Sequence, residues 1–492
     1  MDARLLTPSR SVSTVRGGAG YWTRLLPLLA VLACVSRVPS FTRPLWNPDE
    51  GYLAVQAGLL ARGGELYETV VDRKPPLVPW LYQAAFAVAG HETLTPLRIL
   101  AVLAQLATAV ALASLARRRW GDTAGRTAGV LYLLISVGLN PEDAQAATFE
   151  VFMLPCTATA MWCADRRRPG AAGLAVGCAF LAKQTGGAVL LPVLLLCGAR
   201  RAGTARLVAG AAAPVLGAAL VTDPAGFLFW TVTGSGTYAS LGGSVLPVLG
   251  RALANTAVLA VACAGLLAPV LRSLRLARPG TAGLWPWLAA SAVAVSVGLR
   301  FHGHYYLQLL PPLALLATAA LRTASREHRL RALLVTASCC ALFLTWGLFA
   351  PRAELDHARR LADTAAHRTR PGDRVLFWGM HPEAYWFAGR VPASRYLTAG
   401  LLTNYGGGRD GTRVGERYGV EGAWRTFREE LTAHPPALVV DDSRGKPYAP
   451  DHLPTLRRLL GAAYEEAGEV DGAVLYRRTA AGDRGGGQAV GR

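Results

Sequence analysis

The sequence is poor in charged side chains and has almost no lysine. Charged residues make up 17% of its 492 residues, below the roughly 25% that is typical of soluble domains. Of the 51 basic residues only Lys74, Lys183 and Lys446 are lysines, and all the others are arginines. The low charge argues against a soluble globular protein. Because the chain otherwise uses arginine for its positive charges, the three lysines stand out from the other basic residues.

Cysteine is missing from the polar parts of the chain. The eight cysteines all lie within apolar runs: Cys34, Cys156, Cys163, Cys178, Cys197, Cys263, Cys339 and Cys340. No CxxC spacing is present, which argues against a disulfide framework and against a cysteine-based metal site. A Gly-rich loop that would hold the phosphates of a nucleotide is also missing.

The chain does contain a series of long apolar runs. Because a run of about 20 apolar residues spans a bilayer as a helix, we predict a polytopic α-helical membrane protein with about eleven transmembrane helices. The predicted spans are 22–39, 96–116, 124–140, 148–164, 170–183, 186–198, 205–222, 245–271, 281–299, 304–321 and 330–350. The segment 75–90 is apolar but short and contains three prolines, so it predicts an interfacial or re-entrant helix.

Arginine clusters between the apolar runs indicate the orientation. Clusters such as 117–119, 166–168 and 200–201 follow the positive-inside pattern. The net charge of +19 therefore indicates membrane topology and contact with membrane lipid, not nucleic-acid binding. We predict a multi-pass plasma-membrane protein with a cytoplasmic N-terminus and a first span that is kept, not cleaved as a signal peptide. An odd number of spans places the C-terminus outside, together with the loops at 40–74, 141–149, 223–244 and 300–303.

After Ala350 the composition changes. Short apolar strands alternate with amphipathic helical stretches, which predicts a small extracytoplasmic α/β domain. The strands are expected at 375–378, 437–440 and 473–476, and the helices at 352–369, 421–433 and 454–463. The expected organisation is a transmembrane domain at 1–350 with an outer catalytic loop at 40–95, the α/β domain at 351–480 and a disordered tail at 481–492.

The outer loop after the first span carries the adjacent acids Asp49 and Glu50. Two interpretations are open. Asn47 as the N-cap, Pro48 at the first helical position and Glu50 three residues after the cap would form a capping box. A carboxylate in a partly dry membrane cavity can instead act as a general base toward a hydroxyl or as a metal ligand.

Two lysines lie at unusual backbone positions. Lys74 precedes two prolines, and Lys183 lies at a Gly-containing corner between the short apolar segments 170–183 and 186–198. Lys74 could simply extend to the lipid headgroups, but a lysine ammonium is also a compact point charge that suits a phosphate oxygen. The two short segments predict a broken helical hairpin that lines a cavity, because lipid does not tolerate exposed irregular backbone.

Glu150 opens a predicted span, where its charge either stabilises the helix N-terminus or takes part in a site. Glu142 and Asp143, in the loop before it, are expected to be solvated. Two histidines and two tyrosines mark the outer end of a later span and could bind phosphate, sugar or metal, although tyrosine there also fits an aromatic belt. These residues are His302, His304, Tyr305 and Tyr306.

The order of several short motifs resembles the GT-C fold glycosyltransferases. More narrowly, it resembles the bacterial protein O-mannosyltransferase and aminoarabinose-transferase-like group (glycosyltransferase family 39-like). The motifs are Pro48-Asp49-Glu50-Gly51-Tyr52, Lys74-Pro75-Pro76-Leu77 with Trp80, Thr148-Phe149-Glu150, the stretch from Gly173 to Lys183, and His304-Tyr305-Tyr306-Leu307 before Pro311-Pro312. The segments 371–379 and 385–390 resemble the outer domain of bacterial members, so the resemblance covers most of the chain.

The resemblance implies a cell-envelope glycosyltransferase that moves a sugar from a polyprenyl-phosphate donor to an acceptor hydroxyl on the outer face, with inversion. Asp49 matches the family's acidic residue in the first outer loop, the general base or metal-linked acid. Lys74 matches the lysine that holds the carrier phosphate, and Glu150 stands where the family usually has aspartate. The further candidates are Glu50 as an acid, Arg73, Lys183 and His304 near the phosphate, and Tyr52, Tyr305 and His302 along the substrate.

Several alternatives stay open. The acceptor is a lipid, a polysaccharide or a protein, no cofactor is assigned, and a divalent metal ion is left open. A transporter or flippase of a lipid-linked or anionic substrate would use the same charges for binding. Transporters often have matching broken helices in two repeats, and the single broken hairpin here favours the enzyme. A membrane scaffold would leave Asp49 and Lys74 without a role.

Overall fold

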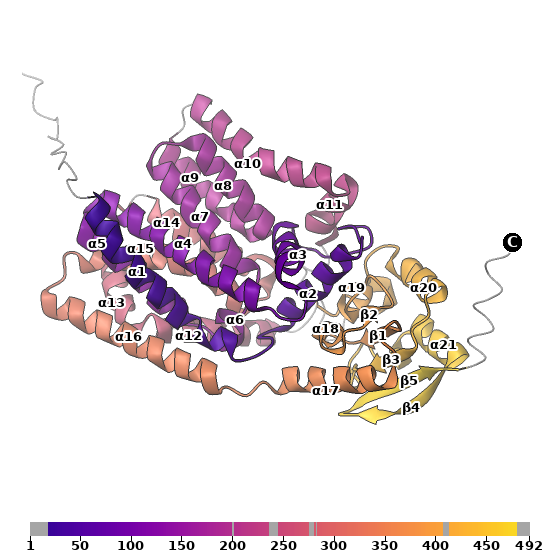
Figure 1. The fold of residues 1–492 in the computed structure, drawn as a ribbon. Coiled ribbons are helices and arrows are strands. Elements are labelled where there is room, and N and C mark those ends of the chain that lie inside the picture. Colours follow the sequence, from indigo (N-terminus) through magenta and orange to yellow (C-terminus); the bar gives the residue numbers. More distant parts are fainter. Residues whose placement is uncertain are drawn as a thin grey trace, which may run out of the picture.

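The structure is a computed structural model that describes residues 18–198, 201–235, 245–274, 280–281, 283–406 and 413–479. It consists of a helical bundle at one end and a smaller unit that contains a sheet at the other (Figure 1). The tail predicted at 481–492 lies outside the described residues.

The bundle contains the helices from α1 to α16. Their bounds are α1 (Gly18–Ser36), α2 (Pro48–Ala61), α3 (Leu77–Ala89), α4 (Thr95–Trp120), α5 (Asp122–Ile135), α6 (Pro141–Ala144), α7 (Phe149–Asp165), α8 (Pro169–Ala182), α9 (Leu190–Cys197), α10 (Arg201–Val221), α11 (Pro224–Thr231), α12 (Val245–Ala262), α13 (Ala264–Leu274), α14 (Leu284–Ser296), α15 (Leu310–Leu321) and α16 (Arg326–Phe349). In the described part of the chain, four helical stretches are long and apolar enough to cross a membrane: α4, α10, α12 and the stretch Arg326–Arg368 that contains α16. The number of spans stays a prediction.

The helix break predicted beside Lys183 is present. After α8 the chain forms a 3₁₀ segment, Gln184–Val189, before α9 begins. Gly186 fits at this corner because an added Cβ would lie 2.3 Å from a carbonyl oxygen of α8. The predicted span 245–271, in contrast, is not a single helix, because it divides at Cys263 into α12 and α13.

The unit after the bundle contains a five-stranded mixed sheet with the strand order β2-β1-β3-β5-β4. The strands are β1 (Arg374–Trp378), β2 (Val391–Pro392), β3 (Leu438–Asp441), β4 (Tyr464–Val470) and β5 (Ala473–Arg478). β1 runs parallel to β2 and β3, whereas β5 is antiparallel to β3 and β4. The three strands predicted from apolar runs are confirmed as β1, β3 and β5. β4 is missed because its sequence is polar, and pairing with β5 sets its structure.

Helices cover both faces of this sheet. α17 (Ala353–Arg368) and α18 (Glu383–Ala388) pack on one face, and α20 (Ala423–Ala433) and α21 (Pro454–Ala463) pack on the other; the short α19 (Ala399–Thr403) follows β2. Successive residues of β1 point to opposite faces of the sheet. Val375 and Phe377 pack with α17 and α18, whereas Leu376 and Trp378 pack with α20 and α21. The predicted helices at 352–369, 421–433 and 454–463 are confirmed.

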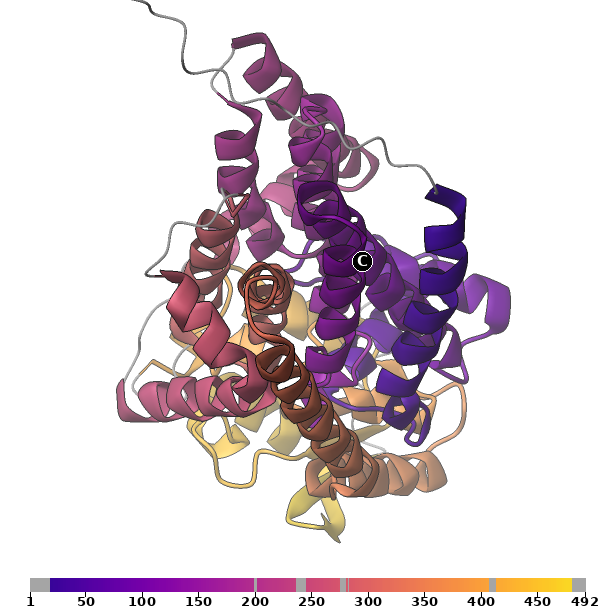
Figure 2. The same cartoon turned by 90° about the vertical axis from the view of Figure 1, so that its left-hand side faces the viewer.

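Helix α2 lies between the bundle and the sheet unit, and Figure 2 shows the sheet unit behind the bundle. Leu53 belongs to the core of the bundle, whereas Val55 belongs to the core formed with α17 and α18. At Gly51 the contact with α18 is so close that an added Cβ would lie 2.3 Å from the Cβ of Glu383. α2 is therefore packed against both the bundle and the sheet unit.

Gly51→Ala is expected to lower the free energy of unfolding by about 1–3 kcal/mol, because the new methyl group overlaps Glu383 and forces α18 away from α2. Thermal unfolding of the detergent-purified protein measures the effect. The control is Gly58→Ala on the same helix, where no heavy atom lies within 4 Å of the added Cβ. Equal melting temperatures for the two variants would contradict the close contact.

Candidate functional site

The centre of the candidate site is an ion pair at the open end of the α7–α8 hairpin. Glu150 lies in the first turn of α7 and Lys183 directly follows α8, so the antiparallel hairpin brings the two side chains together. The Nζ of Lys183 donates to Oε1 of Glu150, and the side chains are only 5% and 1% exposed. Each charge also has the sign that its helix end favours.

The histidine–tyrosine segment lies against this ion pair. The ammonium of Lys183 is 3.7 Å from the ring centroid of Tyr305, a cation–π contact. The His304 Nδ1 lies 2.7 Å from Oδ1 of Asp143, and the ring of His302 stacks on that of His304. Asp143 is therefore buried and bonded, and the expectation of a solvated side chain is wrong.

Asp49 and Lys74 approach the same cluster from the outer loop. Asp49 is the second residue of α2 and is half-buried, within electrostatic reach of Lys183 and Asp72. The Nζ of Lys74 lies 5.3 Å from the ring centroid of Phe149, which precedes Glu150 in the chain. Lys74 therefore lies next to the residue that precedes Glu150, and Asp49 lies within electrostatic reach of Lys183.

Side chains from two helical segments hold the loop that carries Lys74. The hydroxyl of Tyr52 donates to the carbonyl oxygen of Val71 at 2.8 Å. The side-chain amide of Gln184 donates to the carbonyl oxygen of Arg73 at 2.5 Å. Tyr52 thus supports the loop directly, and Gln184, which the motif at the Gly corner contains, is a site residue that the sequence reasoning does not single out.

Glu50 joins the segment before α2 to the segment before α7. Its Oε2 accepts from the backbone N–H of Trp46 at 2.6 Å, and its Oε1 accepts from that of Ala147 at 2.7 Å. The side chain of Asn47 accepts from the N–H of Glu50, as expected for an N-cap. Asn47 is thus confirmed as the N-cap, but the Glu50 carboxylate accepts from Trp46 and Ala147 and not from Asn47 as a capping box requires. Because both of its oxygens are bonded to backbone donors, the geometry favours a structural role of Glu50 over direct catalysis.

Two buried arginines that the sequence reasoning misses fix the backbone around the site. Arg37, 1% exposed, donates to the carbonyl oxygens of Ala144 and Ala146. Arg98, 4% exposed, donates to two carbonyl oxygens of the segment before α2. Both lie at the predicted outer ends of apolar helices, opposite to the arginine clusters, and this position is the signal that could have found them.

Asp72 carries a perturbed carboxyl group in the same loop. Burial raises its pKa from 3.8 to about 6, and the charge of Lys74 opposes part of that rise. Between these values the folded protein binds more protons than the unfolded chain, so the contribution of Asp72 to stability is present below pH 4 and is lost as the pH rises through about 6.

Asp72→Asn is therefore expected to stabilise the protein by about 1–3 kcal/mol above pH 7 and to have no such effect below pH 4. Thermal unfolding as a function of pH measures this difference. Glu68→Gln is the control, because Glu68 is an exposed acid of the same loop. A less stable Asp72→Asn protein at pH 8 would contradict the assignment.

The cluster combines the half-buried Asp49 and the buried acids Glu150 and Asp143 with two lysines and a histidine, a set that can hold an anionic group near a reacting hydroxyl. Among the described residues no group of three or more His, Cys, Asp or Glu side chains could hold a metal ion.

Comparisons with known proteins support the fold. Residues 73–221 match the family model described as dolichyl-phosphate-mannose-protein mannosyltransferase, and no curated protein sequence matches the chain. The structure of ArnT from Cupriavidus metallidurans, bound to undecaprenyl phosphate, superimposes with a TM-score of 0.62 at 16% identity, over 94% of this chain and 99% of that one. The chain has the GT-C fold. The oligosaccharyltransferase of Archaeoglobus fulgidus, solved with Zn and sulfate, superimposes with a TM-score of 0.53 at 14% identity, over 92% of this chain and 73% of that one.

The GT-C resemblance expected from the motifs is thus confirmed as a fold. The superposition on ArnT covers enough of this chain to include both the bundle and most of the sheet unit. The segment that matches the family model contains Lys74, Glu150 and Lys183, whereas Asp49 precedes it and His304 follows it. The GT-C fold therefore joins residues from inside and outside the matched segment in one cluster.

Proposed function

We propose that this GT-C protein is a membrane glycosyltransferase that moves a sugar from a polyprenyl-phosphate-linked donor to an acceptor hydroxyl. The observation that supports this most is that Asp49 and Lys74 both lie within electrostatic reach of Lys183, so that an acid and the two lysines of the bundle share one region. Acid and cations at one place suit a reaction that removes a proton from one reactant and leaves negative charge on a phosphate.

In the proposed step the acceptor oxygen forms a bond to the anomeric carbon while the bond from that carbon to the phosphate oxygen breaks. Asp49 takes the hydroxyl proton, and the bonding electron pair leaves with the polyprenyl phosphate. Lys74 and Lys183, with Arg73 and His304 nearby, stabilise the phosphate charge. Attack opposite to the leaving group inverts the anomeric centre.

The pairing of Lys183 with Glu150 is compatible with phosphate binding. A lysine ammonium has three N–H donors, and Glu150 takes one of them. Glu150 then orients Lys183 and balances its charge before the donor arrives. Tyr305, whose ring lies under the ammonium, and His302 would line the sugar and phosphate.

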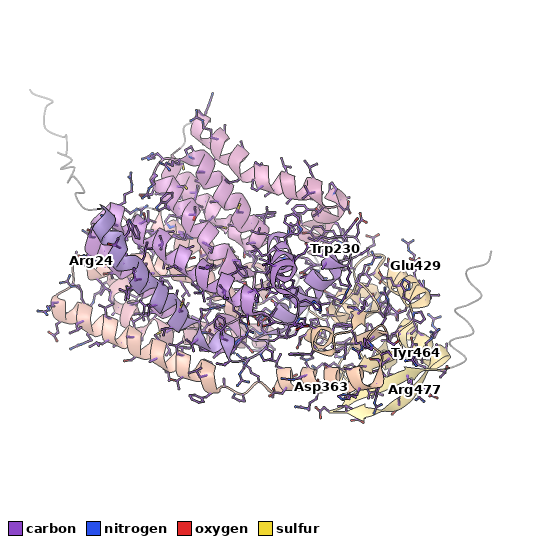
Figure 3. The ribbon with its side chains drawn as sticks, viewed as in Figure 1. Arg24, Trp230, Asp363, Glu429, Tyr464 and Arg477 are labelled. Atoms are coloured by element: carbon purple, nitrogen blue, oxygen red, sulfur yellow. The ribbon has the colours of Figure 1, made fainter. Side chains whose placement is uncertain are left out.

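The proposed reaction takes place at the outer face of the plasma membrane. Figure 3 shows Arg24 at the end of the molecule opposite to Asp363, Glu429 and Arg477 of the sheet unit. This separation supports a cytoplasmic N-terminus and an extracytoplasmic α/β domain at 351–480, after a transmembrane domain at 1–350. The acceptor is proposed to be a lipid, a polysaccharide or a protein of the cell envelope.

The test is sugar transfer by the purified protein in lipid vesicles that contain a series of polyprenyl-phosphate sugars. We expect release of free polyprenyl phosphate together with a glycosylated acceptor, both identified by mass spectrometry. Movement of the intact donor across the vesicle without cleavage would instead identify a flippase. Mass spectrometry of envelope lipids and glycans from a deletion strain identifies the natural acceptor.

A further inference from the structure

A second cluster of titratable side chains lies in the sheet unit, apart from the residues used above. Two of its parts follow β1 and β3, and since these strands are parallel, their carboxyl ends share one edge of the sheet. α17 and the start of α18 supply the rest. The members are Glu354, His357, His381, Glu383, Asp442 and Arg444.

His381 connects the carboxylates of this cluster. Its Nδ1 lies 2.9 Å from Oε1 of Glu383. Its Nε2 lies 3.4 Å from Oε2 of Glu354 and 3.9 Å from Oδ2 of Asp442. The imidazole therefore lies among three carboxylates, and its positive form is the counter-charge nearest to Glu383.

Asp442 has other partners, whereas Glu383 depends on His381. Asp442 Oδ1 lies 2.9 Å from Nε2 of His357 and 3.2 Å from Nε of Arg444. The Glu383 side chain is 1% exposed, and among the described residues its Oε2 has no hydrogen-bond partner. A buried carboxylate is costly unless it is paired, so the charge of Glu383 relies on the ion pair with His381.

Glu383 is also the residue on which α2 rests. A Cβ at Gly51 would lie 2.3 Å from the Cβ and 2.6 Å from the Cα of Glu383. Asp49 is two residues before Gly51, in the same first turn of α2. The contact with α18 and the proposed base therefore belong to the same helical turn, although residues i and i+2 do not share a helix face.

We infer that Glu383 is a positioning residue for Asp49, because its ion pair with His381 keeps α18 seated on the first turn of α2. This inference rests on the proposed function of Asp49. When His381 loses its proton, Glu383 keeps only a neutral hydrogen bond, and its buried charge is no longer balanced. The start of α18 then moves toward water, and the turn that carries Asp49 loses its support.

The charges around His381 determine how its protonation, and with it the support of α2, changes with pH. Burial lowers the pKa of His381, but the hydrogen bond to Glu383 and the charges of Glu383, Asp442 and Glu354 outweigh it and raise that pKa above its ordinary value. The support of α2 is therefore present at low and neutral pH and is lost as the pH rises through the raised pKa. The groups around the pair are Glu354 and His357 from α17, and Asp442 and Arg444 from the loop after β3.

The test compares His381→Gln with His367→Gln, a matched change of an exposed histidine on α17. In the wild type, kcat for sugar transfer is expected to fall as the pH rises from 6 to 9. His381→Gln should be about 100-fold slower at pH 6, independent of pH, and unchanged in the KM for the donor, because a small misplacement of a reacting group costs about that factor. The double variant His381→Gln/Glu383→Gln, which replaces the ion pair by a neutral hydrogen bond, should recover part of kcat and remain independent of pH.

Hydrogen exchange of the peptide that contains the first turn of α2 is the second measurement, and it needs no activity. Exchange there should rise with pH in the wild type and in His367→Gln, and should be high at all pH values in His381→Gln. If the wild type transfers no sugar but shows this exchange pattern, the proposed function fails and the coupling stands. If His381→Gln matches His367→Gln in both kcat and exchange, the inference is overturned. If His381→Gln does not fold, Glu383→Gln decides instead: it has no buried charge to balance, so kcat and exchange should lose their dependence on the charge of His381, and a pH dependence equal to that of the wild type would overturn the inference.

Discussion

Asp49→Asn is expected to reduce kcat for sugar transfer by about 10²- to 10⁴-fold, the usual contribution of a general base. The amide has nearly the shape of the carboxylate but cannot accept the proton of the acceptor hydroxyl. Binding of the donor lipid should change little, because Lys74 and Lys183 remain in place. The expected signature is therefore a loss of kcat with an almost constant KM for the donor.

The fold should tolerate Asp49→Asn. Asp49 lies in the first turn of α2, where a negative charge contributes only about 0.3–1 kcal/mol through the helix dipole. Glu65→Gln is the matched control, since Glu65 is an acid in the loop between α2 and α3. Transfer at the wild-type rate by Asp49→Asn, or an equal loss in Glu65→Gln, would remove Asp49 from the role of base.

Lys183→Met is expected to have a large effect on stability as well as on binding. Removal of one partner leaves Glu150 as an uncompensated buried charge, which costs about 3–5 kcal/mol. The double variant Glu150→Gln/Lys183→Met removes both charges and should recover most of that stability. It should still fail to bind polyprenyl phosphate, because the cation opposite the phosphate is gone. The single and double variants together therefore separate the effect on stability from the effect on donor binding.

Unfolding in detergent and a binding assay with polyprenyl phosphate measure the two properties. Lys446→Met is the control, because Lys446 is the third lysine of the chain and lies in the sheet unit. It should resemble the wild type in both assays. A double variant as unstable as Lys183→Met, or normal donor binding by either, would show that the ion pair does not have the proposed role.

The residue usage of the chain is enough to indicate part of the site. The rarity of lysine singles out Lys74 and Lys183, and both lie in the cluster. Short apolar segments predict the break beside Lys183, and alternating apolar runs predict three of the five strands. These signals are local in the sequence, which is why they can be recognised without knowledge of the fold.

The partners of these residues cannot be recognised in the same way. Asp143 meets His304 across 161 positions, and the contact depends on Gly303, where an added Cβ would lie 2.1 Å from Oδ2 of Asp143. The structural role of Glu50 likewise depends on the N–H of Ala147, in a distant loop. Only the packing of the bundle decides such pairs, and a local pattern does not predict them.

The contact of Gly51 with Glu383 also has a consequence for biosynthesis. Asp49, Lys74, Glu150 and Lys183 are all translated early, whereas α18 is made near the end of the chain. A growing polypeptide can therefore insert every acid and cation of the cluster before the helix that supports α2 exists. If the proposed function holds, turnover of the donor should begin only after α18 has been made and packed on α2.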